Sequence, residues 1–337
     1  MIEPMRGWQI TRTGAPGEVL HLAELPVPEP GPGQLTVDVQ YAGLSFADIL
    51  LIRGEYQVSL PLPCVPGSEF VGRVRACGPE TGIPVGTRVI GLCVWPDGPY
   101  AQVTVVHEDH CEPIPDSLAG PEAVSLIGNY VTAHLALHRR ARVQPGDVVV
   151  VHGGAGGVGV AGIQVAKAAG ATVIAADLGA ERAQACLDAG ADHAVDVTDP
   201  AALTHAVRTL TGGHGADVVL DMVGGDLFDA ARRFVAYEGR IVVVGFTSGT
   251  IPQVRVNQLL LRSFAVVGMN ALTVLNEHPE VHRQARKAVV ELLASGAVAP
   301  PVAAVRAMED LVDLAEAFID RKLTGKAVVH VGPSREE

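Results

Sequence analysis

A glycine-rich turn between an apolar run and a helical segment constrains this chain more than any other feature. The run Asp147-Val-Val-Val-Val-His152 is typical of a buried strand, and Gly153-Gly-Ala-Gly-Gly-Val-Gly159 follows it directly. The turn satisfies the pattern G-x-G-x-x-G, which is weak alone but gains specificity between a strand and a helix. The chain therefore has the signature of a strand–turn–helix unit built to hold a dinucleotide.

Each glycine of the pattern has a physical role. Gly154 permits the tight turn, Gly156 allows the backbone to approach a pyrophosphate, and Gly159 lets the helix pack closely against the strand. Gly157 and Val158 open the helix, where free N–H groups and a partial positive charge favour phosphate. The sequence predicts a Rossmann-type cofactor site.

Two residues after the second strand bear on the choice of cofactor. Asp177 ends that strand, 23 positions beyond Gly154, and a carboxylate there hydrogen-bonds the adenosine ribose and favours NADH. Arg182 follows on the next helix and could hold the extra phosphate of NADPH. The two side chains could also pair with each other, so both cofactors stay open.

Strands and helices alternate through the middle of the chain. Continuous apolar strands that alternate with helices predict a parallel sheet covered on both faces, as in a doubly wound α/β fold. After an opening helical segment over 121–142, the predicted strands are 147–152, 171–177, 191–196, 217–221 and 240–245, and the predicted helices are 157–169, 180–189, 201–211 and 227–237.

The two ends of the chain have a different character. The first third is rich in proline, glycine and β-branched residues, and strands are expected over 34–40 and 101–106, which suggests a small β-barrel-like domain. The alternation ends near 266–268. Two helices over 282–295 and 308–321 and a last strand over 326–331 follow.

Composition narrows the classes of partner. Hydrophobic residues form 48% of the chain and the net charge is −12, which speaks against nucleic acid and anionic membrane as main partners. No apolar run reaches the ~18 residues of a membrane span. Five scattered cysteines indicate reduced thiols rather than a disulfide framework. We therefore expect a cytoplasmic protein that acts on a small molecule.

Several motifs in order resemble the medium-chain dehydrogenase/reductase superfamily, most closely its zinc-independent quinone oxidoreductase branch. The segments that carry this resemblance are Gly43-Leu-Ser-Phe-Ala-Asp48, Val65-Pro-Gly-Ser-Glu-Phe-Val-Gly72, Pro145-Gly-Asp147, Gly153–Gly159, Asp221-Met-Val-Gly-Gly225 and Gly239-Arg-Ile-Val-Val-Val-Gly245.

The resemblance implies a Rossmann doubly wound parallel sheet inserted in a GroES-like β-barrel domain. The GroES-like domain would comprise residues 1–124, completed by 271–337, and the Rossmann domain would comprise residues 125–270. The cofactor would lie in the cleft between the domains, and a homodimer would be usual.

The resemblance also bears on metal. Zinc-dependent relatives place a cysteine ligand where this chain has Ser45, and a histidine ligand where it has Ser68. Serine hydroxyls are poor zinc ligands, so we expect no metal. The one remaining metal-like group, His107-Glu-Asp-His-Cys111, is interpreted as a solvated connection.

The same comparison suggests residues near the reacting groups. Ser45, Asp48 and Tyr56 are the catalytic candidates, with Tyr56 either donating a proton or forming a wall of the pocket. Quinone reductases carry asparagine at the position of Ser45, which leaves the role of that residue open. Five further residues are expected to contact the nicotinamide end of the cofactor: Thr132 by its helix position, and Gly245, Phe246, Thr247 and Gly268.

The resulting expectation is an enzyme that uses NAD(P)H to reduce a quinone or an activated alkene. Relatives usually prefer NADPH and keep a small neutral residue at position 177 and often a tyrosine at position 197, where this chain has Asp177 and Val197. The carboxylate at 177 favours NADH or dual use. A secondary alcohol dehydrogenase and a non-catalytic nucleotide-binding protein remain alternatives.

Overall fold

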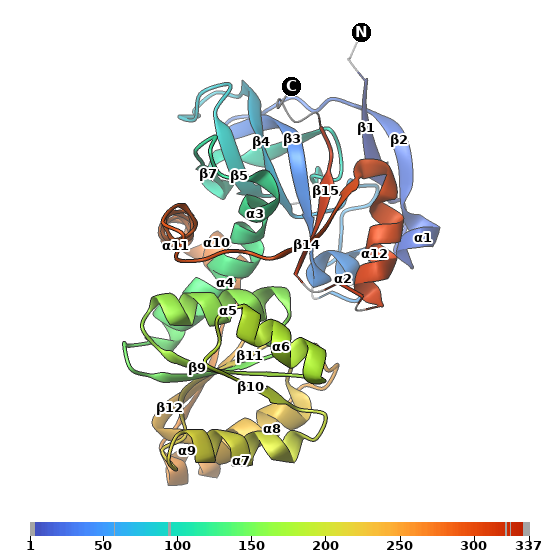
Figure 1. The fold of residues 1–337 in the computed structure, drawn as a ribbon. Helices are drawn as coiled ribbons and strands as arrows, with labels where there is room; N and C mark the ends of the chain where they lie inside the picture. The colour runs from blue at the N-terminus through green and yellow to red at the C-terminus, as the bar shows by residue number, and fades with distance from the viewer. Residues whose placement is uncertain (1–3, 57, 94–95, 321, 324, 333–337) are drawn as a thin grey trace. The chain divides into compact units, whose positions relative to one another are not determined.

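The computed structural model describes residues 4–332 apart from 57, 94–95, 321 and 324 (Figure 1). The chain forms two compact units. The first comprises residues 1–128, 286–290 and 300–337, and the second comprises 129–285 and 291–299. These units are defined by contacts between residues. The predicted domain limits at 124/125 and 270/271 remain a prediction. Among the described residues, no helix has the length and apolar character needed to cross a membrane.

The first unit is built on a largely antiparallel sheet of seven strands and a separate two-stranded ribbon. The sheet has the order β14-β15-β3-β4-β5-β7, with β6 also paired to β3, and the ribbon is β1-β2. The strands are β1 Pro4–Gln9, β2 His21–Pro26, β3 Gln34–Leu44, β4 Glu69–Cys77, β5 Arg88–Leu92, β6 Val103–His107, β7 Cys111–Pro113, β14 Val302–Ala307 and β15 Lys326–His330.

The first unit also contains short helices. They are α1 Pro16–Val19, α2 Phe46–Arg53, η1 Glu108–His110, α3 Gly120–Ser125, η4 Met308–Asp310 and α12 Leu311–Ile319. A shared apolar core, which includes Leu35, Val37 and Leu311, is fully buried between strands and helices. The late strand β15 pairs antiparallel with β3, so both ends of the chain build the same sheet, as a GroES-like domain requires.

Helix α2 shows how local sequence positions one group of candidate residues. Ser45 caps its first turn, and Asp48 completes a reciprocal capping box by accepting from the Ser45 backbone. The helix ends at Gly54, whose φ of 74° is a left-handed conformation that glycine adopts without strain. The cap fixes the position of Asp48 relative to the end of β3.

The second unit contains a six-stranded, wholly parallel sheet with the order β10-β9-β8-β11-β12-β13. Its strands are β8 Val148–His152, β9 Thr172–Asp177, β10 His193–Asp196, β11 Ala216–Asp221, β12 Val235–Val243 and β13 Ala265–Gly268. The helices that lie wholly in this unit are α4 Val131–His134, η3 Leu135–Ala141, α5 Gly157–Ala168, α6 Ala180–Asp188, α7 Pro200–Leu210, α8 Gly225–Phe234, α9 Val256–Arg262 and α10 Ala271–Glu277. Two more helices, η2 Leu126–Tyr130 and α11 Pro279–Ala294, have residues in both units.

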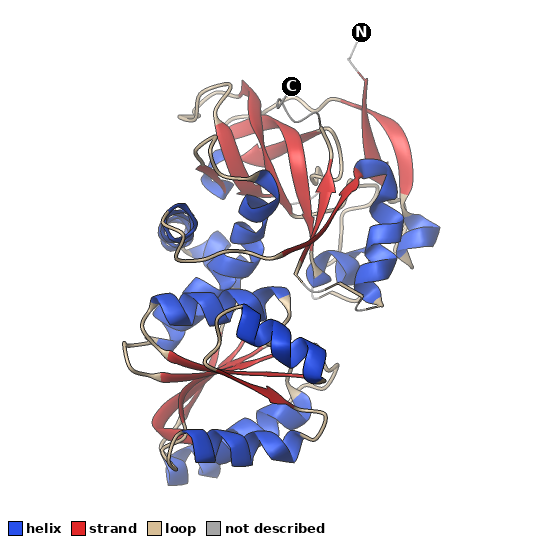
Figure 2. Cartoon of the chain, viewed as in Figure 1, coloured by secondary structure: helices blue, strands red, loops and turns tan. Residues whose placement is uncertain are grey.

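Helices lie on both faces of this sheet (Figure 2), which confirms the predicted doubly wound architecture. The central valines Val149, Val150 and Val151 are fully buried, as expected for a strand covered on both sides. The strand order reverses between β8 and β11. In open α/β sheets, ligands bind outside the carboxyl ends of the strands at such a switch point.

Several details of the prediction were wrong, and it lacked short elements of the first unit, among them β1, β2, β4, β5, β7 and α2. Helix α8 ends at Phe234 rather than at residue 237, because residues 235–237 already belong to β12, where Val235 pairs with Ala216 of β11. The helical region over 121–142 is interrupted by two π-helical stretches. The prediction also lacked α9, α10 and β14, which have few or no buried residues and so give a weak periodic signal.

Candidate nucleotide and substrate sites

The glycine-rich turn has the geometry that its sequence predicts. A Cβ atom on Gly159 would lie 2.0 Å from the carbonyl oxygen of Gly153, so only glycine allows α5 to approach β8 this closely. A Cβ on Gly154 would lie 2.7 Å from the sulfur of Cys186. A Cβ on Gly156 would lie 3.2 Å from the Gly153 oxygen, and apart from the two chain neighbours no other atom of the described residues would lie within 4 Å of it. Gly156 is therefore less crowded than Gly154 or Gly159, which suits the approach of a phosphate.

The start of α5 supplies the other half of a phosphate site. The helix begins at Gly157, and its first amide bonded to the preceding turn is Val160 N–H, which donates to Gly156 O at 2.8 Å. The earlier amides, those of Gly157 and Val158 among them, lack an acceptor within the helix, as at every helix N-terminus. They give the turn its affinity for an anion.

Asp177 lies at the end of β9 with both carboxylate oxygens engaged. Ala155 N–H donates to Oδ2 and Leu178 N–H donates to Oδ1, each at 2.8 Å. Arg182 donates to both oxygens, from Nε at 2.8 Å and from Nη2 at 3.2 Å. The pairing of Asp177 with Arg182 that the sequence left open is present, and it holds the carboxylate directly beside the glycine-rich turn.

The residues expected near the nicotinamide also lie in the second unit. Thr132 lies half-buried on α4, and Asn129, just before that helix, approaches the turn so closely that a Cβ on Gly157 would lie 2.6 Å from its side chain. Gly245, Phe246 and Thr247 follow β12. Gly268 ends β13, and its carbonyl accepts from Arg140 at 2.9 Å.

In the first unit, Ser45, Asp48 and Ser68 form a serine–aspartate cluster. Ser45 donates to Asp48 Oδ2 from its hydroxyl at 2.6 Å and from its backbone N–H at 2.8 Å, and the Ser68 hydroxyl donates to Oδ1 at 2.5 Å. Burial raises the pKa of Asp48, while these hydrogen bonds and the charge of Lys326 act in the opposite direction. The structure thus brings together Ser45 and Asp48, which were predicted, with Ser68.

Sequence reasoning missed a buried ion pair beside this cluster. Lys326 donates to Glu69 at 2.5 Å, and both side chains are 4% exposed. Burial raises the pKa of Glu69, against the charge and the hydrogen bond of Lys326. A charged residue at the start of an apolar strand, Glu69 on β4 and Lys326 on β15, was the signal that could have found it.

Tyr56 lies half-buried against the apolar core of the first unit. Burial raises its pKa, and the nearby charge of Asp48 raises it further. The phenol therefore stays protonated at neutral pH and can serve as a hydrogen-bond donor. Tyr100 is fully buried in the same region, and its hydroxyl donates to Gly43 O at 3.1 Å.

The side chains at the zinc-ligand positions of related dehydrogenases do not fit a zinc ion. Both hydroxyls, those of Ser45 and Ser68, already donate to Asp48, and Glu69 is neutralised by Lys326. Over the described part of the chain, no three or more histidine, cysteine, aspartate or glutamate side chains form a group that could hold a metal, and this includes the stretch from His107 to Cys111.

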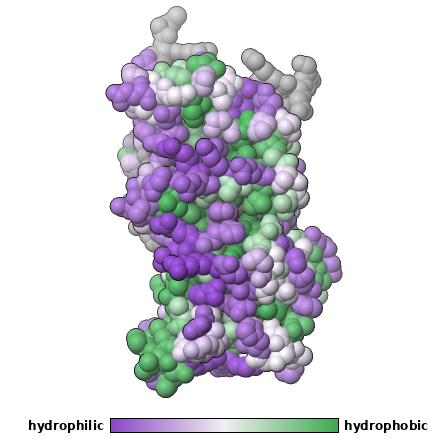
Figure 3. All heavy atoms as spheres, turned by 90° about the vertical axis from the view of Figure 1, so that its left-hand side faces the viewer, coloured by the Kyte–Doolittle hydropathy of each residue, from purple (hydrophilic) through white to green (hydrophobic). Residues whose placement is uncertain are grey.

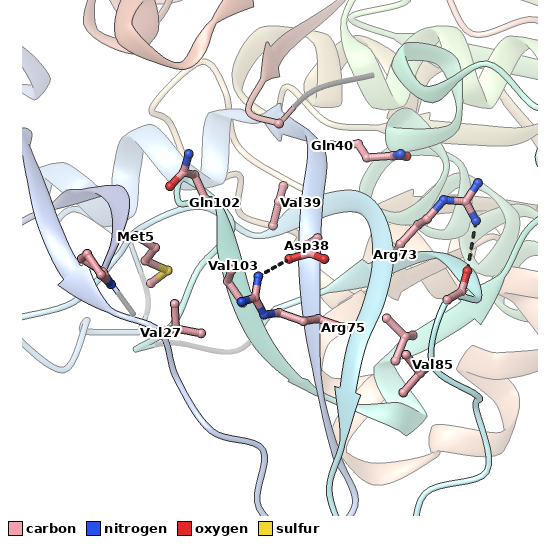
Figure 4. Close-up of a pocket in the computed structure, with 14 residues that line it drawn as sticks. Met5, Val27, Asp38, Val39, Gln40, Arg73, Arg75, Val85, Gln102 and Val103 are labelled. Carbon is pink, nitrogen blue, oxygen red and sulfur yellow. Dashed lines mark hydrogen bonds and ion pairs between the residues drawn. The ribbon is translucent and has the colours of Figure 1, made fainter. Parts of the chain in front are cut away.

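A surface hollow of about 550 Å³ lies elsewhere on the first unit (Figure 4). It is lined by residues of β1, β3, β4 and β6 rather than by the serine–aspartate cluster. Its charged side chains already have partners: Arg75 reaches Asp38 at 3.1 Å, and Arg73 reaches Asp116 at 2.6 Å. The hollow has no reactive group of its own, so its size alone does not make it the site of chemistry.

Comparisons with known proteins agree with this geometry. Residues 31–116 match the family "Alcohol dehydrogenase GroES-like domain", and residues 157–295 match the family "Zinc-binding dehydrogenase". The chain is 35% identical over 321 residues to mouse quinone oxidoreductase-like protein 2, covering 95% of this chain and 90% of that protein. This chain belongs to the medium-chain dehydrogenase/reductase superfamily, in its quinone oxidoreductase branch.

Solved structures of relatives extend the similarity over nearly the whole chain. A mycobacterial quinone oxidoreductase superposes with a TM-score of 0.88 at 32% identity, covering 97% of this chain and 99% of that one. A mycobacterial protein complexed with NADPH gives the same TM-score, identity and coverage. Membership of this branch makes the chain a nicotinamide-dependent oxidoreductase.

Proposed function

We propose that this protein uses a nicotinamide dinucleotide to reduce a quinone or an activated alkene, such as an enone or an enoyl thioester. The observation that carries the proposal is the serine–aspartate cluster, in which both hydroxyls at the zinc-ligand positions are bound to Asp48. A site without a Lewis acid suits an acceptor that is already electron-poor. The enzyme then contributes mainly positioning and mild stabilisation of charge.

The second unit contains the groups that would hold the dinucleotide. The backbone at Gly156, which has no side chain, and the first amides of α5 suit the pyrophosphate, and Asp177 suits the adenosine ribose. When bound, the dinucleotide supplies the hydride. Thr132, the residues from Gly245 to Thr247, and Gly268 are proposed to orient its nicotinamide end.

The first unit contains the groups proposed to act on the substrate. Tyr56 keeps its proton at neutral pH and would donate a hydrogen bond to a substrate oxygen. Asp48 would not contact the substrate itself. It would position Ser45 and Ser68, which its carboxylate oxygens hold in place. We therefore assign Tyr56 the donor role and treat Asp48 and Ser45 as positioning residues.

NADH, or dual use of NADH and NADPH, is proposed as the cofactor specificity. The carboxylate of Asp177 opposes a 2′-phosphate, and it would accept from ribose hydroxyls in place of an Arg182 donor. Arg182 has its Nε and Nη2 turned to Asp177, so it is partly neutralised as a phosphate ligand. The NADPH-bound mycobacterial relative supports the other choice, and a comparison of the two cofactors decides between them.

A stopped-flow experiment tests the proposed function. Oxidation of NADH and of NADPH is followed against quinones, enones, enoyl thioesters and secondary ketones, with Tyr56→Phe as the active-site variant. Rapid turnover of at least one electron-poor acceptor, with ketones much slower, is the expected result. Preferred turnover of ketones would indicate an alcohol dehydrogenase, and binding of cofactor without turnover of any acceptor would indicate a non-catalytic protein.

Metal independence is part of the same proposal. Elemental analysis after mild purification should find far less than one zinc per chain, and chelators should leave the activity unchanged. Stoichiometric zinc whose removal abolishes activity would contradict the interpretation of Ser45 and Ser68.

We also propose that the protein forms a homodimer through an α9 surface, defined as Tyr237, Ile251, Val256, Leu260 and Leu261. These side chains are 70–78% exposed, and Figure 3 shows hydrophobic side chains gathered at one lower corner, in the region where Figure 1 draws α9. The nearby strand β13 ends the order of the parallel sheet. An exposed edge strand beside apolar surface suits pairing with the same edge of a second copy.

The oligomeric state tests this surface. Light scattering should give a dimer for the wild type and a monomer for Leu260→Glu/Leu261→Glu. The control Leu210→Glu, at an exposed leucine of α7, should stay dimeric.

The cytoplasm is the proposed location, because the five cysteines are free thiols, which suits a reducing compartment.

A further inference from the structure

A buried histidine–aspartate pair, His152 and Asp221, lies where two neighbouring strands of the second unit end. His152 is the last residue of β8, and Asp221 is the last residue of β11. The two strands pair directly, with Leu220 opposite Val151. His152 Nδ1 lies 3.0 Å from Asp221 Oδ1, and both side chains have no exposed surface. The pair thus lies at the switch point of the sheet, directly before the glycine-rich turn.

Asp221 organises the turns that follow β11 and β12. Its Oδ1 accepts from the N–H groups of Val223 at 3.0 Å and Gly224 at 3.1 Å, which shapes the turn into α8. Its backbone carbonyl accepts from Val244 at 2.8 Å and from Gly245 at 3.4 Å. One residue therefore fixes the turn 222–224 and the start of the turn 244–249.

His152 connects this arrangement to the glycine-rich turn. It precedes Gly153, which adopts a φ of 65°, and a Cβ on Gly153 would lie 3.2 Å from Val223. The imidazole ring is held edge-on by the ring of Phe234, with 6.4 Å between the ring centroids. Movement of the imidazole would therefore displace both the first residue of the glycine-rich turn and Asp221.

Stability alone is a poor explanation of this pair. The hydrogen bonds from His152, Val223 and Gly224 hold the pKa of Asp221 below its usual value against the effect of burial, so the carboxylate is ionised in the interior. His152 Nε2 and Asp221 Oδ2 are buried without a hydrogen-bond partner among the described residues. A buried polar pair that leaves atoms without a hydrogen bond incurs a desolvation cost for them, and such groups call for another explanation.

We propose that His152 and Asp221 are positioning residues that hold the glycine-rich turn and the turn 244–249 in a fixed relation. The first turn takes the pyrophosphate, and the second contains Gly245, Phe246 and Thr247, which are assigned to the nicotinamide end. The pair thereby sets the orientation of the nicotinamide rather than the affinity for the adenosine half. This inference rests on the proposed function for the identity of the ligand.

The chain offers a matched control for a variant of this pair. At the opposite ends of the same two strands, His214 Nε2 lies 2.9 Å from Asp217 Oδ1, and Val148 N–H donates to Asp217 Oδ2 at 2.8 Å. His214→Leu removes a histidine–aspartate contact far along the strands from the glycine-rich turn. His152→Leu removes the pair under study, and His152→Asn keeps an N–H donor near the position of Nδ1.

Three measurements separate positioning from a structural role. Hydrogen exchange of the cofactor-free protein should speed up at least tenfold over 222–225 and 244–250 in His152→Leu. The Kd for ADP-ribose should stay within threefold of wild type. The rate of hydride transfer in a single turnover should fall at least tenfold. If no acceptor is found, the fluorescence of bound NADH is measured instead, and it should fall to the value of free NADH. His152→Asn should recover most of each change, and His214→Leu should cause none.

Several outcomes would overturn the inference. Equal losses in the affinities for ADP-ribose and NADH would mean that the pair only supports the glycine-rich turn. Unchanged hydrogen exchange in His152→Leu would mean that the pair does not connect the two turns. If His152→Leu does not fold, His152→Phe, which keeps a ring against Phe234, takes its place. Failure of the acceptor panel alone would contradict the proposed function, while the exchange and fluorescence results would still decide the role of the pair.

Discussion

Replacing Asp177 by serine tests how this protein selects its cofactor. A carboxylate about 4 Å from a phosphate is repelled by about 1 kcal/mol per unit charge in water-like surroundings, and a phosphate monoester carries roughly −1.5 to −2 charges at pH 7. Asp177→Ser should therefore favour NADPH by about 1.5–2 kcal/mol relative to NADH, roughly 10- to 30-fold in the ratio of catalytic efficiencies. Loss of the ribose hydrogen bond would add to the shift.

The same substitution also releases Arg182. In the wild type its Nε and Nη2 both donate to Asp177, and without the carboxylate they become available to a 2′-phosphate. Asp177→Ser/Arg182→Ala should therefore lose the additional gain that Arg182 provides and keep the part that comes from removing the carboxylate. Because Ala155 N–H also loses its acceptor, the variant should be about 1–3 kcal/mol less stable, which urea unfolding measures.

Asp192→Ser is the matched control. Asp192 also pairs with a cation, Lys167, and accepts from a β9 amide, that of Val173, but near the opposite end of that strand. It should change stability without changing cofactor preference. Strong preference of the wild type for NADPH, together with no shift in Asp177→Ser, would refute the reasoning, since Asp177 would then not face the ribose.

Three further substitutions give separate tests. Gly156→Val should fold, because its Cβ, 3.2 Å from the Gly153 oxygen, needs only a small local shift, but it should bind NADH at least tenfold more weakly in a fluorescence titration. Gly159→Ala should lower the melting temperature, since its Cβ would lie 2.0 Å from the same oxygen and overpacking typically costs 1–3 kcal/mol. Tyr56→Phe should lower kcat about tenfold or more and leave the Kd for NADH unchanged, if the phenol donates to the substrate.

The fold of the second unit and its nucleotide turn could be predicted because their signals are local. Runs of valine with helices between them allow few arrangements other than a covered parallel sheet. A helix that starts this close to a strand leaves no room for side chains in the turn between them. A Cβ on Gly159, for example, would collide with Gly153. Asp177 was found by its spacing from the turn, without any knowledge of the rest of the chain.

The interactions that the sequence concealed join residues far apart in the chain. Glu69 and Lys326 are 257 positions apart, and only the pairing of β15 with β3 and of β3 with β4 brings them together. His152 and Asp221 meet because β8 and β11 become neighbours when the strand order reverses. Such pairs follow from sheet register, and no local periodicity contains that information.

The ion pair of Glu69 and Lys326 makes a last prediction, in which pH decides the size of the effect. Lys326→Met leaves Glu69 buried without its cation, and breaking a buried pair in this way typically costs 3–5 kcal/mol at neutral pH. Burial already raises the pKa of Glu69 in the wild type, and loss of Lys326 removes the charge that opposes this rise. The folded variant therefore binds a proton that the unfolded chain has released.

Stability falls with rising pH wherever the folded state holds more protons, so the variant should lose more stability at pH 8 than at pH 5.5. Urea unfolding at both values measures the difference, and Glu69→Gln/Lys326→Met should remove the part due to Glu69 and leave only the part due to Asp48, whose pKa Lys326 also lowers. An equal loss at both pH values would mean that Glu69 stays ionised without Lys326 and finds another partner.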